Sequence, residues 1–301
     1  MMRTCARRVA AAIPLGCILL AGCTVRFDAE EQLGREEKRF KVSGPPEVRV
    51  ATFDGSIELR SWERDEVLVE IEKRGMDEQA LQSMEVRADQ QGDRIEVDVR
   101  RPSGRDGFVG IGIHMSPRAR LLVTVPRRVT LLHARSGDGT IRADRIEGRV
   151  ELRTRDGRVQ ADEMKGQIDV DTADGSIAVN DVDGDLVLVT RDGGINVSGR
   201  LAALRAKTGD GSITVRADAG GPTAADWSIS TGDGGVVMYL PRGFNAELDA
   251  ETRDGRIRSD FEVGDIHDDS RRRRSLRGRI GDGGPIVRIR TGDGSIHLRH
   301  W

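Results

Sequence analysis

The stretch VELRTRDGRVQADEMKGQ, residues 150–167, is followed directly by IDVDTADGSIAVNDVDGD, residues 168–185. Both segments keep Thr-x-Asp-Gly at the same place, whereas the residues around this motif vary. Repeats of a fixed period are typical of proteins built from stacked units. Five Asp-Gly pairs keep the spacing of eighteen residues: Asp138 and Gly139, Asp156 and Gly157, Asp174 and Gly175, Asp192 and Gly193, Asp210 and Gly211.

Apolar residues alternate with polar ones on both sides of each Asp-Gly pair. Alternation of period two indicates strands with one buried face. Two residues before each Asp there is a threonine or serine. Four and six residues before it, the residues are largely aliphatic. The columns three and five residues after each Asp are Ile141 and Ala143, Val159 and Ala161, Ile177 and Val179, Ile195 and Val197, Ile213 and Val215.

A second glycine column at Gly148, Gly166 and Gly184 divides each unit into two strands and two corners. We therefore predict an all-β fold, a β-helix-like solenoid with rungs of eighteen residues and Asp-Gly corners. An antiparallel meander or sandwich is the alternative, because Asp-Gly between alternating strands also favours a hairpin. The strict period favours the solenoid. In the corner, we expect Asp to bond nearby backbone and Gly to supply a positive φ.

Five further Asp-Gly pairs have looser spacing and extend the count to ten candidate rungs: Asp54, Asp233, Asp254, Asp282 and Asp293. Residues 76–125 are less regular, with a predicted helix at 77–84 and strands near 94–100 and 119–125. We assign 47–126 to an N-terminal β region and cap, and 127–301 to the solenoid. One rung buries too few side chains to offset the entropy of ordering its backbone, so the rungs must stack.

The N-terminus has the pattern of a secretory signal peptide, residues 1–22. Arg3, Arg7 and Arg8 precede an apolar run over 9–20, too short to span a bilayer. It ends in Leu-Ala-Gly-Cys, which resembles a bacterial lipobox and implies lipid on Cys23. Residues 23–46 then read as a lipidated N-terminus and a charged tether. We expect an exported lipoprotein held in the membrane by this lipid, at the outer membrane or cell surface rather than the inner membrane.

Composition argues against several function classes. Opposite charges nearly cancel and aromatics are 3% of residues, so neither a nucleic-acid surface nor a large aromatic ligand pocket is expected. The five histidines show no zinc spacing, and we find no catalytic motif, metal site or cofactor motif. Calcium at the Asp corners is a weaker hypothesis, because calcium requires six to eight converging oxygens.

The lipobox, VRVATFDGSIEL (residues 48–59) and the tandem T-x-D-G-x-I-x-V units together resemble the bacterial putative-adhesin β-strand-repeat family, a domain of unknown function. The resemblance runs from about Val48 to the C-terminus. It implies a repetitive β fold and brings no catalytic residues.

Two functional hypotheses follow. The first is a non-enzymatic, lipid-anchored envelope protein with an adhesin-like or scaffold role, in contact with an envelope polymer or a surface protein. The second is a carbohydrate-active β-helix enzyme that acts on an acidic polysaccharide, since such folds can host paired carboxylates.

Overall fold

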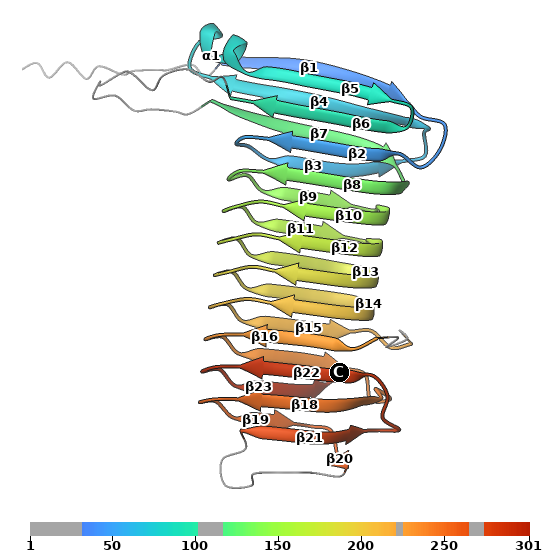
Figure 1. Ribbon diagram of the computed structural model, residues 1–301, viewed down its shortest axis with the longest axis vertical. Helices are drawn as coiled ribbons and strands as arrows, with labels where there is room; N and C mark the ends of the chain where they lie inside the picture. The colour runs from blue at the N-terminus through green and yellow to red at the C-terminus, as the bar shows by residue number, and fades with distance from the viewer. Residues whose placement is uncertain (1–31, 102–116, 221–224, 265–273) are drawn as a thin grey trace, which may run out of the picture. The chain divides into compact units, whose positions relative to one another are not determined.

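The computed structural model describes residues 32–101, 117–220, 225–264 and 274–301, which form 23 strands and one helix (Figure 1). The first elements are β1 Gln32–Lys41, β2 Glu47–Thr52, β3 Ile57–Trp62, β4 Glu66–Gly75, α1 Glu78–Ser83, β5 Glu85–Gln91, β6 Arg94–Arg100, β7 Arg118–Pro126, β8 Arg128–Ser136, β9 Ile141–Asp144, β10 Glu147–Arg153 and β11 Val159–Asp162. The remaining strands are β12 Lys165–Asp171, β13 Ile177–Val189, β14 Ile195–Lys207, β15 Ile213–Ala217, β16 Trp227–Thr231, β17 Val236–Leu240, β18 Ala246–Thr252, β19 Ile257–Ser259, β20 Val263–Gly264, β21 Ser275–Ile280, β22 Ile286–Thr291 and β23 Ile296–His300.

Successive coils stack as two ladders of parallel strands (Figure 1). The pre-corner ladder, which leads into the Asp-Gly corners, runs β6, β2, β8, β10, β12, the end of β13, the end of β14, β16, β22 and β18. The post-corner ladder runs β7, β3, β9, β11, the start of β13, the start of β14, β15, β17, β23 and β19. Parallel pairing confirms the predicted solenoid, since a meander would pair its strands antiparallel.

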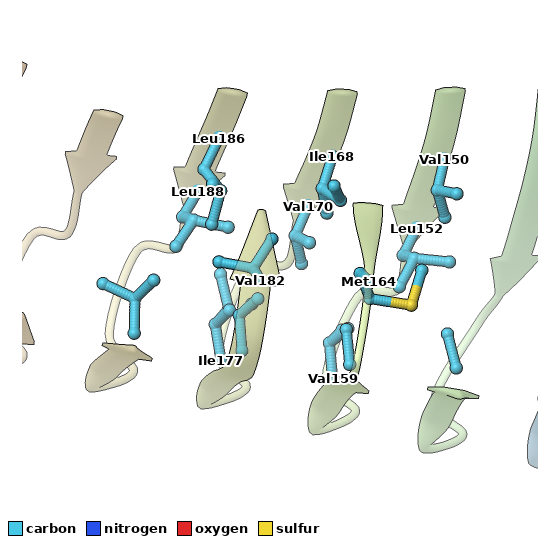
Figure 2. Packing of buried hydrophobic residues seen from close by; sticks show 14 of the residues in the cluster. Val150, Leu152, Val159, Met164, Ile168, Val170, Ile177, Val182, Leu186 and Leu188 are labelled. Carbon is cyan, nitrogen blue, oxygen red and sulfur yellow. The ribbon is translucent and has the colours of Figure 1, made fainter. Parts of the chain in front are cut away.

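Equivalent apolar side chains lie on one another inside the coil (Figure 2). Val159 pairs in register with Ile177, which pairs with Ile195, and all three side chains are fully buried. The column eight residues after the corner Asp is buried as well, with Ile146, Met164 and Val182. One continuous aliphatic core therefore fills the space between the two ladders.

The corner glycines are required by close stacking. A Cβ added at Gly175 would overlap the carbonyl oxygen of Gly157 in the rung before, and the same holds for the other corner glycines. Among them, a positive φ occurs at Gly55 alone within the described residues. The expectation that these glycines supply a positive φ is therefore wrong: the chain bends at the other corners without a positive φ there, and glycine is needed because of the short distance between stacked backbones.

Threonine, rather than aspartate, makes the hydrogen bonds of the corner. The Thr190 hydroxyl donates to the carbonyls of Ala173 (3.1 Å) and Gly175 (2.9 Å) in the rung before, and accepts the amide of Gly193 (3.2 Å) in its own rung. Thr154, Thr172, Thr208, Thr231 and Thr252 repeat the donation across rungs. The prediction gave this role to the corner Asp. In the structure, a column of buried threonines bonds the corner backbone instead.

The rungs do not stack in chain order at the C-terminal end. β22 and β23, the last strands of the chain, lie between the β16–β17 rung and the β18–β19 rung (Figure 1). Asp282 is not a rung corner, so nine of the ten candidate Asp-Gly pairs are corners, and the remaining rung is formed by β6 and β7, which none of these pairs connects. Asp282 lies in the turn between β21 and β22, where its amide bonds the side chain of Asn245. Ile280 occupies the position that threonine or serine holds in the rungs, so the hydrogen bonds of a corner are lacking there.

The N-terminal end is closed in a similar way. β2 and β3 lie inside the β6–β7 rung, which is therefore the outermost parallel rung at this end. The predicted helix is confirmed as α1, whose first turn is capped by Asp77. β1 pairs along its whole length with β4, so 32–41 of the expected tether belong to the folded unit. Residues 1–22 and Cys23 lie outside the described residues.

We predict that Gly175→Ala destabilises the protein by about 2–4 kcal/mol, because its methyl group would force two stacked backbones apart. Urea unfolding of the purified variant measures this change. Gly243→Ala is the matched control, since an added Cβ there meets no atom within 4 Å. Equal stability of the two variants would contradict the close-stacking argument.

Thr190→Val keeps the shape of the side chain and removes its hydroxyl. It leaves two carbonyls and one amide of the corner without this partner, so we predict a loss of about 1–3 kcal/mol in the free energy of unfolding. Thr214→Val, on the outer surface of β15, should change it by less than about 0.5 kcal/mol. A neutral Thr190→Val would show that the threonine column does not hold the rungs in register.

Candidate functional site

The stack brings the predicted corner aspartates together along one edge, which we call the corner column. In space its order is Asp54, Asp138, Asp156, Asp174, Asp192, Asp210, Asp233, Asp293 and Asp254. Each arginine next to a corner pairs with the aspartate of the neighbouring rung rather than with its own. These ion pairs are Arg155–Asp138 (3.7 Å), Arg191–Asp174 (3.7 Å) and Arg253–Asp293 (3.3 Å).

Stacked carboxylates affect one another within this column. The pKa of Asp192 is raised by partial desolvation and by the charges of Asp174 and Asp210 on either side. In the part of the chain that the structure describes, no three His, Cys, Asp or Glu side chains are grouped so that they could hold a metal ion. The corner column is therefore a series of solvated turn residues, and its arginines partly offset the repulsion.

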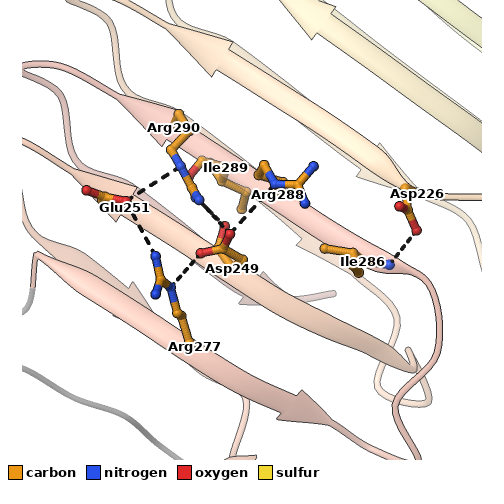
Figure 3. Close-up of polar contacts among 8 residues, drawn as sticks. All are labelled: Asp226, Asp249, Glu251, Arg277, Ile286, Arg288, Ile289 and Arg290. Carbon is orange, nitrogen blue, oxygen red and sulfur yellow. Dashed lines mark hydrogen bonds and ion pairs between the residues drawn. The ribbon is translucent and has the colours of Figure 1, made fainter.

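A second charged cluster closes the C-terminal end of the pre-corner ladder (Figure 3). Asp249 on β18 receives hydrogen bonds from Arg277 on β21 (2.9 Å) and from Arg290 on β22, and Arg288 lies 3.7 Å away. An acidic strand thus lies between two basic strands. Opposite charges on adjacent strands stabilise their pairing, which favours the position of β22 between β16 and β18. The charges of this cluster are satisfied within the fold, so it is a structural feature rather than a ligand site.

An open hollow on the outer surface of the pre-corner ladder, next to the corner column, is the candidate site. We call it the corner groove; its volume is about 730 Å³. It crosses the five rungs that end in β8, β10, β12, β13 and β14. Most of its lining residues stand three and one positions before the corner aspartates: Arg135, Arg153, Asp171, Val189 and Lys207, and Gly137, Arg155, Ala173, Arg191 and Gly209. His133, Ser136, Thr154, Thr172 and Thr190 complete the lining.

The corner groove is basic, and part of its charge has no partner. Arg135, Arg153 and Lys207 are exposed and form no ion pair with any residue of the described ranges. Arg155 and Arg191 make only the long, exposed pairs of the corner column, which contribute little to stability. Five cations therefore face the solvent around one acidic lining residue, Asp171.

The inward columns, on which the predicted fold depends, do not reveal the groove. The outward positions repeat with the same period, and a count of charge at the first and third residue before each Asp would have shown the excess of arginine and lysine. That count gives the residue types, while the hollow depends on how long each neighbouring side chain is.

Residues 47–299 match the family described as Toastrack DUF4097. The chain belongs to this family. The match includes the stack, the corner column and the corner groove of the toastrack chain, and it agrees with the β-strand-repeat fold implied by the resemblance. Among curated proteins, none matches the chain. Within the described ranges, we find no helix with the length and apolar character of a membrane span.

Several solved structures are similar to the toastrack chain at low sequence identity. A putative adhesin from Parabacteroides merdae is 11% identical, with 88% of this chain and 95% of that chain covered and a TM-score of 0.46. A putative adhesin from Bacteroides fragilis is 11% identical, with 88% of this chain and 97% of that chain covered and a TM-score of 0.41. A putative lipid binding protein from Parabacteroides distasonis is 12% identical, with 88% of this chain and 96% of that chain covered and a TM-score of 0.35. These descriptions differ, and similarity at this level gives no ligand for the toastrack chain.

The stabilising role of Asp249 predicts a pH dependence. Burial by itself would raise its pKa, but hydrogen bonds from Arg290 and Arg277 outweigh burial and lower the pKa below its ordinary value. A carboxylate with a lowered folded-state pKa stabilises the fold above about pH 4, the unfolded value, and loses this effect as the pH falls through the folded value.

We therefore expect Asp249→Asn to lower the free energy of unfolding by about 1–2 kcal/mol at pH 7, and by much less at pH 3. Urea unfolding at the two pH values measures this difference. Asp185→Asn, an exposed carboxylate on the same ladder, is the control and should be nearly neutral at both. A pH-independent effect of Asp249→Asn would rule out the ionised carboxylate as the cause.

Proposed function

We propose that this chain is an exported, lipid-anchored envelope protein that acts by contact, in an adhesin-like or scaffold role, without catalysis. Cys23 would carry the lipid, and the outer membrane or cell surface would be its place. The motif Leu-Ala-Gly-Cys at the end of the apolar segment supports the anchor. Family membership supports the repetitive β architecture on which this role depends.

The main observation behind the proposal is that the two faces of each strand have different environments. Inward side chains form one aliphatic core, and outward side chains of both ladders face solvent over successive rungs. A stack with this arrangement offers flat, rigid surfaces for an extended partner. The corner groove is a hollow in such a surface, open to solvent and lined by cations.

The enzymatic alternative gains no support from the corner groove. Glycoside hydrolysis uses two carboxyl groups about 5–9.5 Å apart on either side of the bond to be cleaved. The groove has one carboxylate among its lining residues, Asp171.

Expression of the full-length chain and of Cys23→Ser in a Gram-negative host tests the anchor. We expect the wild-type chain to incorporate a radiolabelled fatty acid and to sediment with outer membranes, because two or more acyl chains bind a bilayer tightly. Cys23→Ser should incorporate no label and remain in the periplasmic fraction. Cys17→Ser, within the predicted signal peptide, is the control and should behave like the wild type. Unlabelled wild-type protein in the soluble fraction would contradict the proposal.

A further inference from the structure

The corner groove differs in shape and charge from one end to the other. Ala173 after β12 and Val189 at the end of β13 are short side chains near its middle. Arg153 and Arg155 stand on the neighbouring rung of β10, and Arg191 and Lys207 stand on the rungs of β13 and β14. The floor consists of corner backbone whose carbonyls are already bonded to the buried threonines. A ligand therefore meets corner backbone and short side chains between two groups of cations.

The distances between these cations follow from the rung spacing. Arg155 and Arg191 are two rungs apart, which corresponds to about 10 Å for strands about 4.8 Å apart. Arg135 and Lys207 are four rungs apart, or about 19 Å on the same basis. The groove is thus suited to an extended ligand that lies along the stack and carries widely spaced negative charges.

Asp171 limits which of these ligands fit, because it places a negative charge in the groove. It lies in the middle of the groove, in register with Arg153 of the neighbouring strand. An ionised carboxylate accepts hydrogen bonds and repels other anions. It therefore favours a ligand with hydroxyl groups in its central part, and it opposes a polymer with an unbroken series of negative charges such as polyphosphate.

We propose that the corner groove binds an acidic polysaccharide that carries a carboxylate on alternate sugars. Arg153 and Arg155 hold one carboxylate, and Arg191 and Lys207 hold the next. The sugar between them lies over Ala173 and Val189 and donates hydroxyl hydrogen bonds to Asp171. This inference rests on the proposed function, because the protein meets such a polymer only if it is exported.

The test uses the full-length protein, purified in detergent, and three probes of similar length. They are a hyaluronan octasaccharide, with a carboxylate on alternate sugars, an uncharged dextran oligosaccharide, and polyphosphate. We expect hyaluronan to bind more tightly than either of the others, with an affinity that falls as salt is added. No hyaluronan binding by the wild type, or tighter polyphosphate binding, overturns the proposal.

A triple variant locates the binding. Arg153→Gln, Arg191→Gln and Lys207→Gln together should weaken hyaluronan binding at least tenfold, because three charge-assisted contacts are removed. The matched control removes three exposed, unpaired arginines from the post-corner ladder, by Arg142→Gln, Arg258→Gln and Arg299→Gln. It should change affinity by less than twofold. Equal affinities of the two triple variants would overturn the groove as the site.

Two further measurements separate the possible failures. Melting temperatures of both triple variants should lie close to that of the wild type, since all six side chains are exposed.

Asp171→Asn should reduce the preference for hyaluronan over polyphosphate severalfold, and an unchanged preference would contradict the role of Asp171. If the triple groove variant loses hyaluronan binding but the wild-type chain carries no lipid label and stays soluble in cells, the proposed anchor is wrong and the groove proposal holds. If the wild-type chain is lipid-labelled and membrane-bound but does not bind hyaluronan, the anchor holds and the groove proposal is wrong.

Discussion

The contact between the backbones of successive corners is the constraint on which the rest of this structure depends. Each corner glycine lies so close to a backbone carbonyl of the neighbouring rung that no side chain fits between them. The threonine two residues before the Asp bonds across this contact to the neighbouring rung and back to its own. The close contact and the cross-rung hydrogen bond recur along the corner column, with Ser136 in place of threonine at the Asp138 corner. Adjacent rungs therefore have one possible register, and the inward columns of aliphatic residues are aligned as a consequence.

Stacking also explains how the unit ends. A parallel ladder leaves unpaired backbone groups at its last strand, and such edges promote aggregation. Here the terminal rungs are covered by antiparallel strands, β18 by β21 at one end and β7 by β4 and β1 at the other. Ion pairs support both covers: Asp249 links β21 to β22, and Arg120 on β7 reaches Glu58 and Glu72 on its neighbours. The two ends thus use the same combination of reversed strands and cross-strand charges.

The outward residues carry the functional information, because the inward residues are fully committed to the core. Successive rungs can change their outer side chains without disturbing the register, so neighbouring rungs can differ in length and charge. The corner groove results from such differences: the short side chains of Ala173 and Val189 lie between Arg153 and Arg155 on one side and Arg191 and Lys207 on the other. A recognition surface for an extended polymer can be built in this way without a deep pocket and without a change in the fold.

The period of eighteen, the inward columns and the Thr-x-Asp-Gly corners are readable from the sequence, because each depends on residues close together along the chain. These features sufficed to predict the solenoid and its core. The tertiary structure alone decided the order of the rungs and the place of Asp282. Near-equivalent rungs have nearly equal inward faces, so the neighbour of β18 is chosen by cross-strand charges far apart in sequence. It also decided why the corner needs glycine and where the corner groove lies, since both depend on distances between rungs that a linear pattern does not contain.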